Sequence, residues 1–201
     1  MKKTNLVYIL LTMETLLTFL RTFRPITDDE AVLIIPYFQV KHFKEGEYLF
    51  SAGKVCKELF FIASGVLRIV AINNKGVDVT HYFIRDRQFC TMLQSFNDET
   101  IASDSIQACC GAHVLSITKD KLLALYQKLP FMADLINQVN QQRMLEKIRL
   151  KNAYSGEDAV ARYKVFLSEE SEIAYRVPLN YIASYLNVTP QSLSRIRRSL
   201  T

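Results

Sequence analysis

The chain has 201 residues, of which 49% are hydrophobic and 22% are charged. This length and composition suit one large or two small globular domains and exclude a chain without packed cores. The formal net charge of +5 is compatible with a polyanionic partner, but it is informative only if the positive residues gather on one face.

The N-terminus combines a basic start with a short apolar run, Leu6 to Leu11. No small-residue cleavage site follows, and Glu14 and Arg21 interrupt a longer span, so we predict neither a signal peptide nor a membrane segment. Met13 offers an alternative start, which would leave residues 1–12 as a poorly ordered extension. An amphipathic helix is predicted from apolar residues at helical spacing: Leu16, Leu17, Phe19, Leu20 and Phe23.

A second short helix is predicted before Pro36. Thr27 is expected to be its N-cap, with Glu30 completing a capping box three residues later. We therefore assign residues 1–36 to an N-terminal helical segment.

The texture changes to short β-rich runs between Tyr37 and Ile117. Seven or so strands at a spacing of about 8–12 residues predict a sandwich or a small barrel. A hairpin turn is expected at Asn73–Gly76, and Gly46, Gly53 and Gly65 are expected at other corners. The predicted runs are YFQVKHF, EYLF, LFFIASG, VLRIVAI, VDVTHYFI, SIQACC and HVLSI.

The segment KEGEYLFSAGKVCKELFFIASGVLRIVAINNKG, residues 44–76, resembles the first half of a cyclic-nucleotide-binding β-roll of the Crp/Fnr family of bacterial transcription regulators. The glycines at 46, 53 and 65 and the apolar run Leu59 to Ile62 carry this resemblance. It implies an antiparallel double-stranded β-helix, or jelly roll, over residues 37–128.

The cAMP-binding members of that family carry a Gly-Glu pair for the ribose and, about ten residues later, an Arg-Ser/Thr pair for the cyclic phosphate. Ungapped alignment places Thr91 and Met92 at the first pair and Ala102 and Ser103 at the second. A buried phosphate without its cation costs several kcal/mol, and Asp104 adds repulsion. We therefore predict that neither cAMP nor cGMP binds in the usual pose.

The degenerate pocket still leaves two alternatives open: a cavity for a small apolar effector, or a filled core without a ligand. Its expected residues are Phe89, Cys90, Thr91, Met92, Leu93, Ala102 and Ser103. The four cysteines form no CxxC pair and the three histidines have no ligand spacing, so free thiols in a reducing cytosol are expected, with no metal and no cofactor. The adjacent Cys109 and Cys110 would point to opposite faces if they lay in a strand.

Thr118 is expected to cap a short helix, and Pro130 to begin a long one that ends at Ser155–Gly156. The long helix, assigned with its lead-in to residues 129–154, resembles the family's dimerisation helix. Polar interruptions at Asn137–Gln138 and Asn140–Gln142 keep open the alternative of a helix packed on its own β-roll. Its apolar stripe is Met132, Ile136, Met144, Leu145 and Ile148.

Residues 155–201 are predicted to form an all-α domain, in which a helix from Glu157 to Leu167 is followed by an acidic loop, Ser168–Ser171. Leu179 to Thr201 then resembles a helix-turn-helix motif. Asn187 tolerates a left-handed backbone, Thr189 is a good N-cap and Pro190 suits the first helical position. Small Ala183 lets the helices cross closely. An ordinary helical hairpin with a basic face remains the alternative.

The segment from Ile173 to the end holds four arginines and no acid. The resemblance implies that the second helix reads DNA bases with Gln191, Ser192 and Arg195. Phosphate contacts are expected from Thr189, Ser194, Arg197 and Arg198. Family members usually add a two-stranded wing after this helix, and the sequence leaves no room for one before Thr201.

The sequence therefore predicts an α+β protein with a β-roll, a dimerisation helix and a wingless helix-turn-helix domain. We expect a cytoplasmic, non-enzymatic transcription regulator that binds double-stranded DNA as a homodimer, on an inverted repeat with half-sites ~34 Å apart. RNA polymerase and a small apolar effector are further partners that the resemblance allows, and no membrane is expected. The alternative function is a sensor that acts through a protein partner without DNA.

Overall fold

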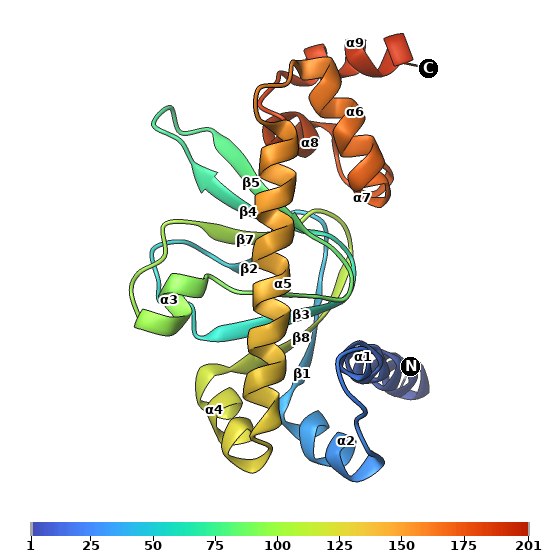
Figure 1. Ribbon diagram of the computed structural model, residues 1–201, viewed down its shortest axis with the longest axis vertical. Coiled ribbons are helices and arrows are strands. Elements are labelled where there is room, and N and C mark those ends of the chain that lie inside the picture. The colour runs from blue at the N-terminus through green and yellow to red at the C-terminus, as the bar shows by residue number, and fades with distance from the viewer. Residues whose placement is uncertain (1, 201) are drawn as a thin grey trace.

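The structure is a computed structural model that describes the backbone of residues 2–200 and the side chains of residue 7 and residues 9–200. Helices precede, interrupt and follow a set of strands, and α5 runs along the long axis of the molecule (Figure 1). The helices are α1 Lys2–Arg21, α2 Asp28–Ile34, the 3-10 turn η1 Ile35–Tyr37, α3 Leu93–Asp98, α4 Lys119–Lys128, α5 Phe131–Tyr154, α6 Ala159–Glu169, α7 Ser171–Arg176, α8 Leu179–Tyr185 and α9 Pro190–Leu200. The strands are β1 Gln39–Phe43, β2 Tyr48–Phe50, β3 Glu58–Ser64, β4 Leu67–Ile72, β5 Asp78–Ile84, β6 Gln88–Cys90, β7 Ser105–Ala108 and β8 Ala112–Thr118.

The strands form two four-stranded antiparallel sheets, ordered β1-β8-β3-β6 and β2-β7-β4-β5, which together we call the β-roll. Apolar side chains from both sheets meet in one buried cluster that includes Phe60, Ile62, Leu67, Ile106 and Val114. Alternate residues of each strand supply this interior because side chains in a strand point to opposite faces. The mixed fold with an antiparallel β-roll is confirmed.

Strand β3 explains the continuous apolar run of the sequence. Phe60 and Ile62 point into the β-roll, whereas Leu59 and Phe61 belong to a second cluster beneath α1. A strand that is covered on both faces loses the polar alternation of a half-exposed strand. The run Leu59 to Ile62 is therefore apolar at every position.

Two strand predictions need correction. β6 was not predicted, since it is only three residues long and contains Gln88; it forms by pairing with β3, with Cys90 opposite Phe60. β7 ends at Ala108, so Cys109 and Cys110 lie in the connection that follows and not in a strand. The expected hairpin turn is present, with Gly76 N–H donating to the Asn73 carbonyl at 2.9 Å.

Gly65 occupies the corner between β3 and β4 with φ at 117°. A Cβ atom built there would lie 2.6 Å from the Cβ of Ala112, which is closer than side chains approach. Only glycine combines this backbone conformation with this contact. The corner brings β3 and β4 together where Asp86 also binds the Gly65 N–H.

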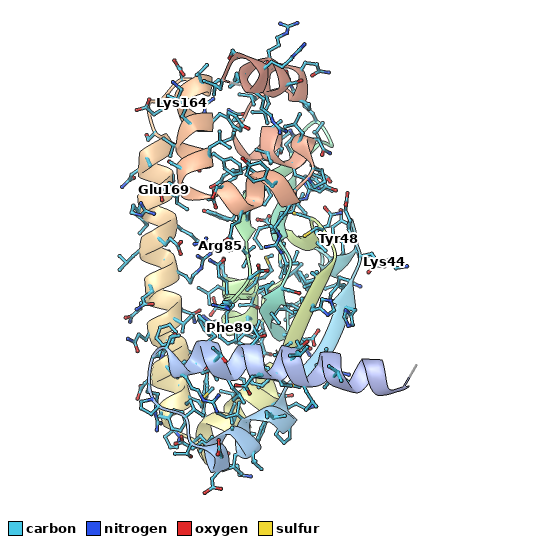
Figure 2. All side chains as sticks on the ribbon, turned by 90° about the vertical axis from the view of Figure 1, so that its right-hand side faces the viewer. Lys44, Tyr48, Arg85, Phe89, Lys164 and Glu169 are labelled. Atoms are coloured by element: carbon cyan, nitrogen blue, oxygen red, sulfur yellow. The ribbon has the colours of Figure 1, made fainter. Side chains whose placement is uncertain are left out.

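Helix α1 is continuous from Lys2, so the expectation that residues 2–12 form a poorly ordered extension is wrong. No glycine or proline interrupts the chain before Pro25, and the leucine-rich run favours helix. Met13, Leu16, Leu17 and Leu20 are buried against the β-roll. Figure 2 shows α1 crossing the end of the sheets.

The expected caps of α2 and α4 are confirmed. Thr27 and Glu30 form both hydrogen bonds of the capping box at 3.2 and 2.9 Å, and the Thr118 hydroxyl accepts from Lys121 N–H at 3.4 Å. Each side chain satisfies an N–H group that has no partner within its helix. These caps fix where the flanking helices begin relative to the β-roll.

The two halves of α5 have different environments. Met132, Leu135, Ile136 and Val139 are buried against the chain's own β-roll. Farther along, an apolar stripe stays exposed: Met144 is 51%, Leu145 68% and Ile148 49% exposed. The expected single stripe along the helix is therefore divided, because its first half packs within the chain and its second half faces solvent.

The segment between α6 and α8 also differs from the prediction. The expected loop at Ser168–Ser171 is the junction of two helices, since α6 runs to Glu169 and α7 begins at Ser171. Glu170 is buried, and the Tyr154 hydroxyl donates to its Oε2 at 3.2 Å. On α6, Tyr163 and Phe166 are buried, whereas Val160 is 37% exposed.

Candidate nucleic-acid interface

Helices α8 and α9 are joined by a turn whose residues behave as their chemistry predicts. Asn187 has φ at 54°, in the left-handed region. Val188 N–H donates to the Ala183 carbonyl at 2.9 Å, and the Thr189 hydroxyl accepts from Ser192 N–H at 3.1 Å. Pro190 is the first residue of α9. The turn therefore redirects the chain without leaving the start of α9 uncapped.

Close packing fixes the angle between these two helices. Ala183 and Leu193 are fully buried, and Ile182 and Leu186 complete the contact. The small Ala183 side chain allows α9 to cross α8 closely. Since Leu193 anchors the inner side of α9, the opposite side faces solvent.

The structure brings the expected base-reading residues to one exposed helix. Gln191, Ser192 and Arg195 are exposed near the N-terminal half of α9. The Ser192 hydroxyl accepts a hydrogen bond from the Thr189 hydroxyl at 2.9 Å, so these two side chains form a pair. Guanidinium and amide groups on such a face can bind base edges or phosphates.

The expected phosphate contacts lie around the same helix. Thr189, Arg197 and Arg198 are exposed, whereas Ser194 is half-buried. The sequence of α9, PQSLSRIRRSL, contains no acid, so its exposed side is cationic. Its position at the end of the molecule, beyond the β-roll, leaves this side open (Figure 1).

A hydrogen bond and an aromatic ring contact hold α8 against β5 of the β-roll. Thr80 N–H donates to the Ser184 hydroxyl at 2.9 Å. The Tyr185 ring meets the Phe83 ring edge-on at 5.0 Å between centroids. The orientation of the α8–α9 pair is thus set by the β-roll as well as by the neighbouring helices.

Sequence reasoning missed the buried Arg68, which lies in β4 and contacts both the β-roll and α8. Its guanidinium donates to Gln107, Thr80 and Asp78 at 2.8, 2.9 and 3.1 Å. The same group lies 3.7 Å from the centre of the Tyr181 ring of α8. A buried charge needs such a complete set of partners. Its position within an apolar strand, VLRIVAI, was the available signal.

The residues of the degenerate pocket separate into two places. Met92, Leu93, Ala102 and Ser103 surround a hollow of about 210 Å³ at α3. Phe89, Cys90, Thr91 and Leu93 line a second space of about 90 Å³ between the β-roll and α5. Both are below the ~300 Å³ at which ligand pockets begin.

Three side chains account for the small size of the second space. Phe89 is buried and packs against Phe61, with centroids 5.0 Å apart. The Thr91 hydroxyl donates to the Glu58 carbonyl at 2.9 Å. Burial raises the pKa of the Cys90 thiol to about 12, so this side chain behaves as a small apolar group.

A larger cavity, which sequence reasoning missed, lies where the β-roll, α5 and the C-terminal helices meet. This junction cavity has a volume of about 520 Å³ and is lined by parts of β5, α5, α6 and α8. Glu170 lies in its wall, and burial raises the pKa of this carboxyl above its ordinary value. Burial also raises the pKa of the neighbouring Tyr154 and Tyr185 phenols.

The described residues offer no group of three or more His, Cys, Asp or Glu side chains arranged to hold a metal ion. The four cysteines are free thiols, three of them buried. Among the helices of the described chain, none combines the length and apolar character needed to cross a membrane.

Comparison with known proteins agrees with this architecture. Residues 40–129 match the family model of the cyclic nucleotide-binding domain. No curated protein matches the sequence.

Three solved structures show the same arrangement over most of the chain. The c-di-GMP responsive global regulator CLP of Xanthomonas campestris has a TM-score of 0.67 and 16% identity, covering 84% of this chain and 89% of that one. A Crp/Fnr-family transcriptional regulator from Eubacterium rectale has a TM-score of 0.65 and 19% identity, covering 87% and 83%. The catabolite activator protein of Thermus thermophilus has a TM-score of 0.53 and 21% identity, covering 89% and 85%. At these identities the likeness establishes a shared fold.

Proposed function

We propose that the chain is a transcription regulator of the Crp/Fnr type that binds a specific inverted repeat of double-stranded DNA as a homodimer. The observation that carries this proposal is the exposed cationic side of α9, presented by a capped turn and anchored by the buried Leu193. A helix presented in this way fits the major groove of DNA. The likeness to solved regulators of this fold supports the same reading.

Within this proposal, Gln191, Ser192 and Arg195 contact base edges. All three are exposed in the first half of α9, which is the half that enters the groove in this motif. The Arg195 guanidinium can bind guanine through two hydrogen bonds, and the Gln191 amide can do the same with adenine.

Arg197 and Arg198 then bind phosphates, with Thr189 and Ser194 as neutral contacts. These arginines occupy the last turn of α9, beyond the residues that read bases. Positive side chains at this position neutralise phosphates and fix the register of the helix on the duplex.

The homodimer forms through the exposed half of α5. Met144, Leu145 and Ile148 give this half an exposed apolar stripe. The other long helix, α1, packs its buried apolar side chains on the β-roll. Parallel pairing of two such stripes would place the two α9 helices at the same end, facing successive major grooves. Their separation would match half-sites ~34 Å apart.

Cyclic nucleotides do not control this protein in the proposed function. Ala102 occupies the position of the arginine that binds the cyclic phosphate, and it is buried, with its N–H donating to the Lys54 carbonyl at 2.9 Å. The small volumes near Met92 and Cys90 support a filled β-roll over an apolar effector cavity.

The salt dependence of DNA binding tests the proposal. Binding of a fluorescent duplex of mixed sequence should weaken steeply as salt increases, with about 0.9 in log–log slope for each phosphate contacted. The double variant Arg197→Gln and Arg198→Gln should lower the slope by about 2, whereas Lys121→Gln on the distant α4 should not change it. Absence of binding even at low salt would contradict the proposal and favour the alternative of a sensor that acts without DNA.

A further inference from the structure

The junction cavity is built from parts of the chain that are distant in sequence. One wall is β5 of the β-roll, a second is the C-terminal half of α5, and the third comes from the end of α6 and from α8. Its volume of about 520 Å³ lies within the usual range for small-molecule sites, roughly 300–1,000 Å³. Such sites commonly occur where two domains meet.

Positive charge exceeds negative charge around this cavity. Its described lining contains five Lys or Arg side chains and three Glu side chains. Arg85 of the β-roll and Arg143 of α5 both pair with one carboxylate, Glu146, and Arg85 lies 3.5 Å from it. Arg85 also interacts with Glu170, but burial raises the pKa of that carboxyl and so disfavours its charged form. The two guanidinium groups are therefore only partly balanced. Figure 2 marks Arg85 between the sheets and α5.

Lys147 adds a further cation without an anionic partner. Its Nζ lies 4.6 Å from the centre of the Tyr82 ring. Among the side chains that the structure describes, no carboxylate lies within ion-pair distance of Lys147. Burial lowers the pKa of this ammonium group, which means that its positive charge is held in an unfavourable environment. An anion placed beside it would relieve that cost.

The rest of the lining offers aromatic and hydrogen-bonding surface. Tyr82 and Phe83 come from β5, Tyr154 from α5 and Tyr185 from α8. The Tyr154 hydroxyl is held by Glu170, so this corner of the cavity is ordered by a buried polar contact. Aromatic walls with a few cations suit a ligand that has both an apolar part and a negative group.

We propose that the junction cavity is a binding site for a small organic anion with an aromatic or apolar portion. Lys147, Arg85 and Arg143 would bind the anionic group, and Tyr82 and Tyr185 would contact the apolar portion. Arg143 and Lys147 also line the small space beside Cys90, whereas Arg85, Tyr82 and Tyr185 line the junction cavity and not that space.

A ligand here would touch both the β-roll and the C-terminal helices. Ser184 and Tyr185 belong to α8, which carries α9, and they line the cavity together with β5. Binding would therefore favour one placement of α9 relative to the β-roll, by the difference in affinity between the placements. This regulatory consequence rests on the proposed DNA-binding function, whereas the binding site itself does not.

The test uses phenyl phosphate, which combines an aromatic ring with a phosphate group, and isothermal calorimetry on the full chain without DNA. We expect saturable binding that is weakened roughly tenfold or more by Lys147→Gln and by Arg85→Gln, because each removes a charge-assisted contact. Lys121→Gln on α4 should bind as the natural chain does. Benzyl alcohol, which has the ring without the charge, should bind more weakly.

Arg85 lines the junction cavity but is not among the described lining residues of the small space beside Cys90. Loss of affinity in Arg85→Gln and Lys147→Gln together would therefore locate the ligand in the junction cavity. No saturable binding by the natural chain, or equal affinity in either folded variant, would overturn the proposal. Since no DNA is present, these outcomes are independent of whether the chain binds DNA.

Discussion

Arg176 at the end of α7 binds Asp86 of the β-roll with both ends of its guanidinium group. Its Nη1 lies 2.6 Å from Oδ2 of Asp86, and its Nη2 lies 3.2 Å from Oδ1. Asp86 also accepts a hydrogen bond from Gly65 N–H at the corner between β3 and β4. A bidentate ion pair therefore connects the C-terminal helices to the β-roll of the same chain.

Replacing Arg176 by glutamine should loosen this connection. Each side chain of the pair is about one-third exposed, 33% and 31%, so solvent screens it in part. We expect a loss of about 1 kcal/mol in the free energy of unfolding, measured with urea, and faster amide exchange in α8. The exposed Lys164→Gln on α6 provides the control. Equal stability and equal exchange in Arg176→Gln and the natural chain would contradict this role.

The exposed stripe of α5 gives a second prediction. Leu145→Glu should convert the proposed dimer to a monomer in sedimentation equilibrium, because a charge would be buried at the interface between the two α5 helices. Leu123→Glu is a matched control, since Leu123 is 50% exposed on another helix, α4. The control should remain dimeric. A monomeric natural chain, or a dimeric Leu145→Glu variant, would show that the stripe is not the interface.

Cyclic nucleotides should not stabilise the protein. A ligand at a hundredfold excess over its Kd adds about 2.7 kcal/mol of stability, which a thermal melt detects easily. Because Ala102 and Met92 replace the expected anchors, we predict the same melting temperature with and without cAMP or cGMP. A rise that saturates with cAMP concentration would contradict this expectation.

Arg195 and Arg198 should differ in what they contribute to DNA binding. Arg195→Ala should cost about 1–3 kcal/mol at one base pair and relax the preference there. Arg198→Ala should instead weaken binding to all sequences alike. Competition between the selected site and its single-base variants distinguishes the two effects. If Arg195→Ala kept both affinity and preference, its assignment as a base reader would be wrong.

Local sequence chemistry predicted some parts of the structure well. Asn187, Thr189 and Pro190 specify the turn between α8 and α9 through their own backbone preferences and through one hydrogen bond between residues three positions apart. Thr27 and Glu30 form the capping box for the same reason. Such features depend on residues only a few positions apart, so a single sequence contains the information needed.

Other features depend on partners that the sequence alone does not identify. Arg68 bonds Gln107, which is 39 positions away, and Arg176 bonds Asp86, which is 90 positions away. The sequence places Glu170 in a predicted acidic loop, yet the packing of α5 and α6 buries its side chain. The junction cavity could not be predicted either, since it exists only where β5, α5 and α8 meet.

The central claim is that α9 reads a specific DNA sequence from a dimeric protein. Its most direct test is selection of binding sites from a random pool of duplex DNA by the purified protein, without added ligand, at near-physiological salt. We predict enrichment of an inverted repeat with half-site centres ~34 Å, or about 10 base pairs, apart. A pool that shows no enriched sequence, even after an extract of cellular metabolites is added to supply an effector, would contradict the account.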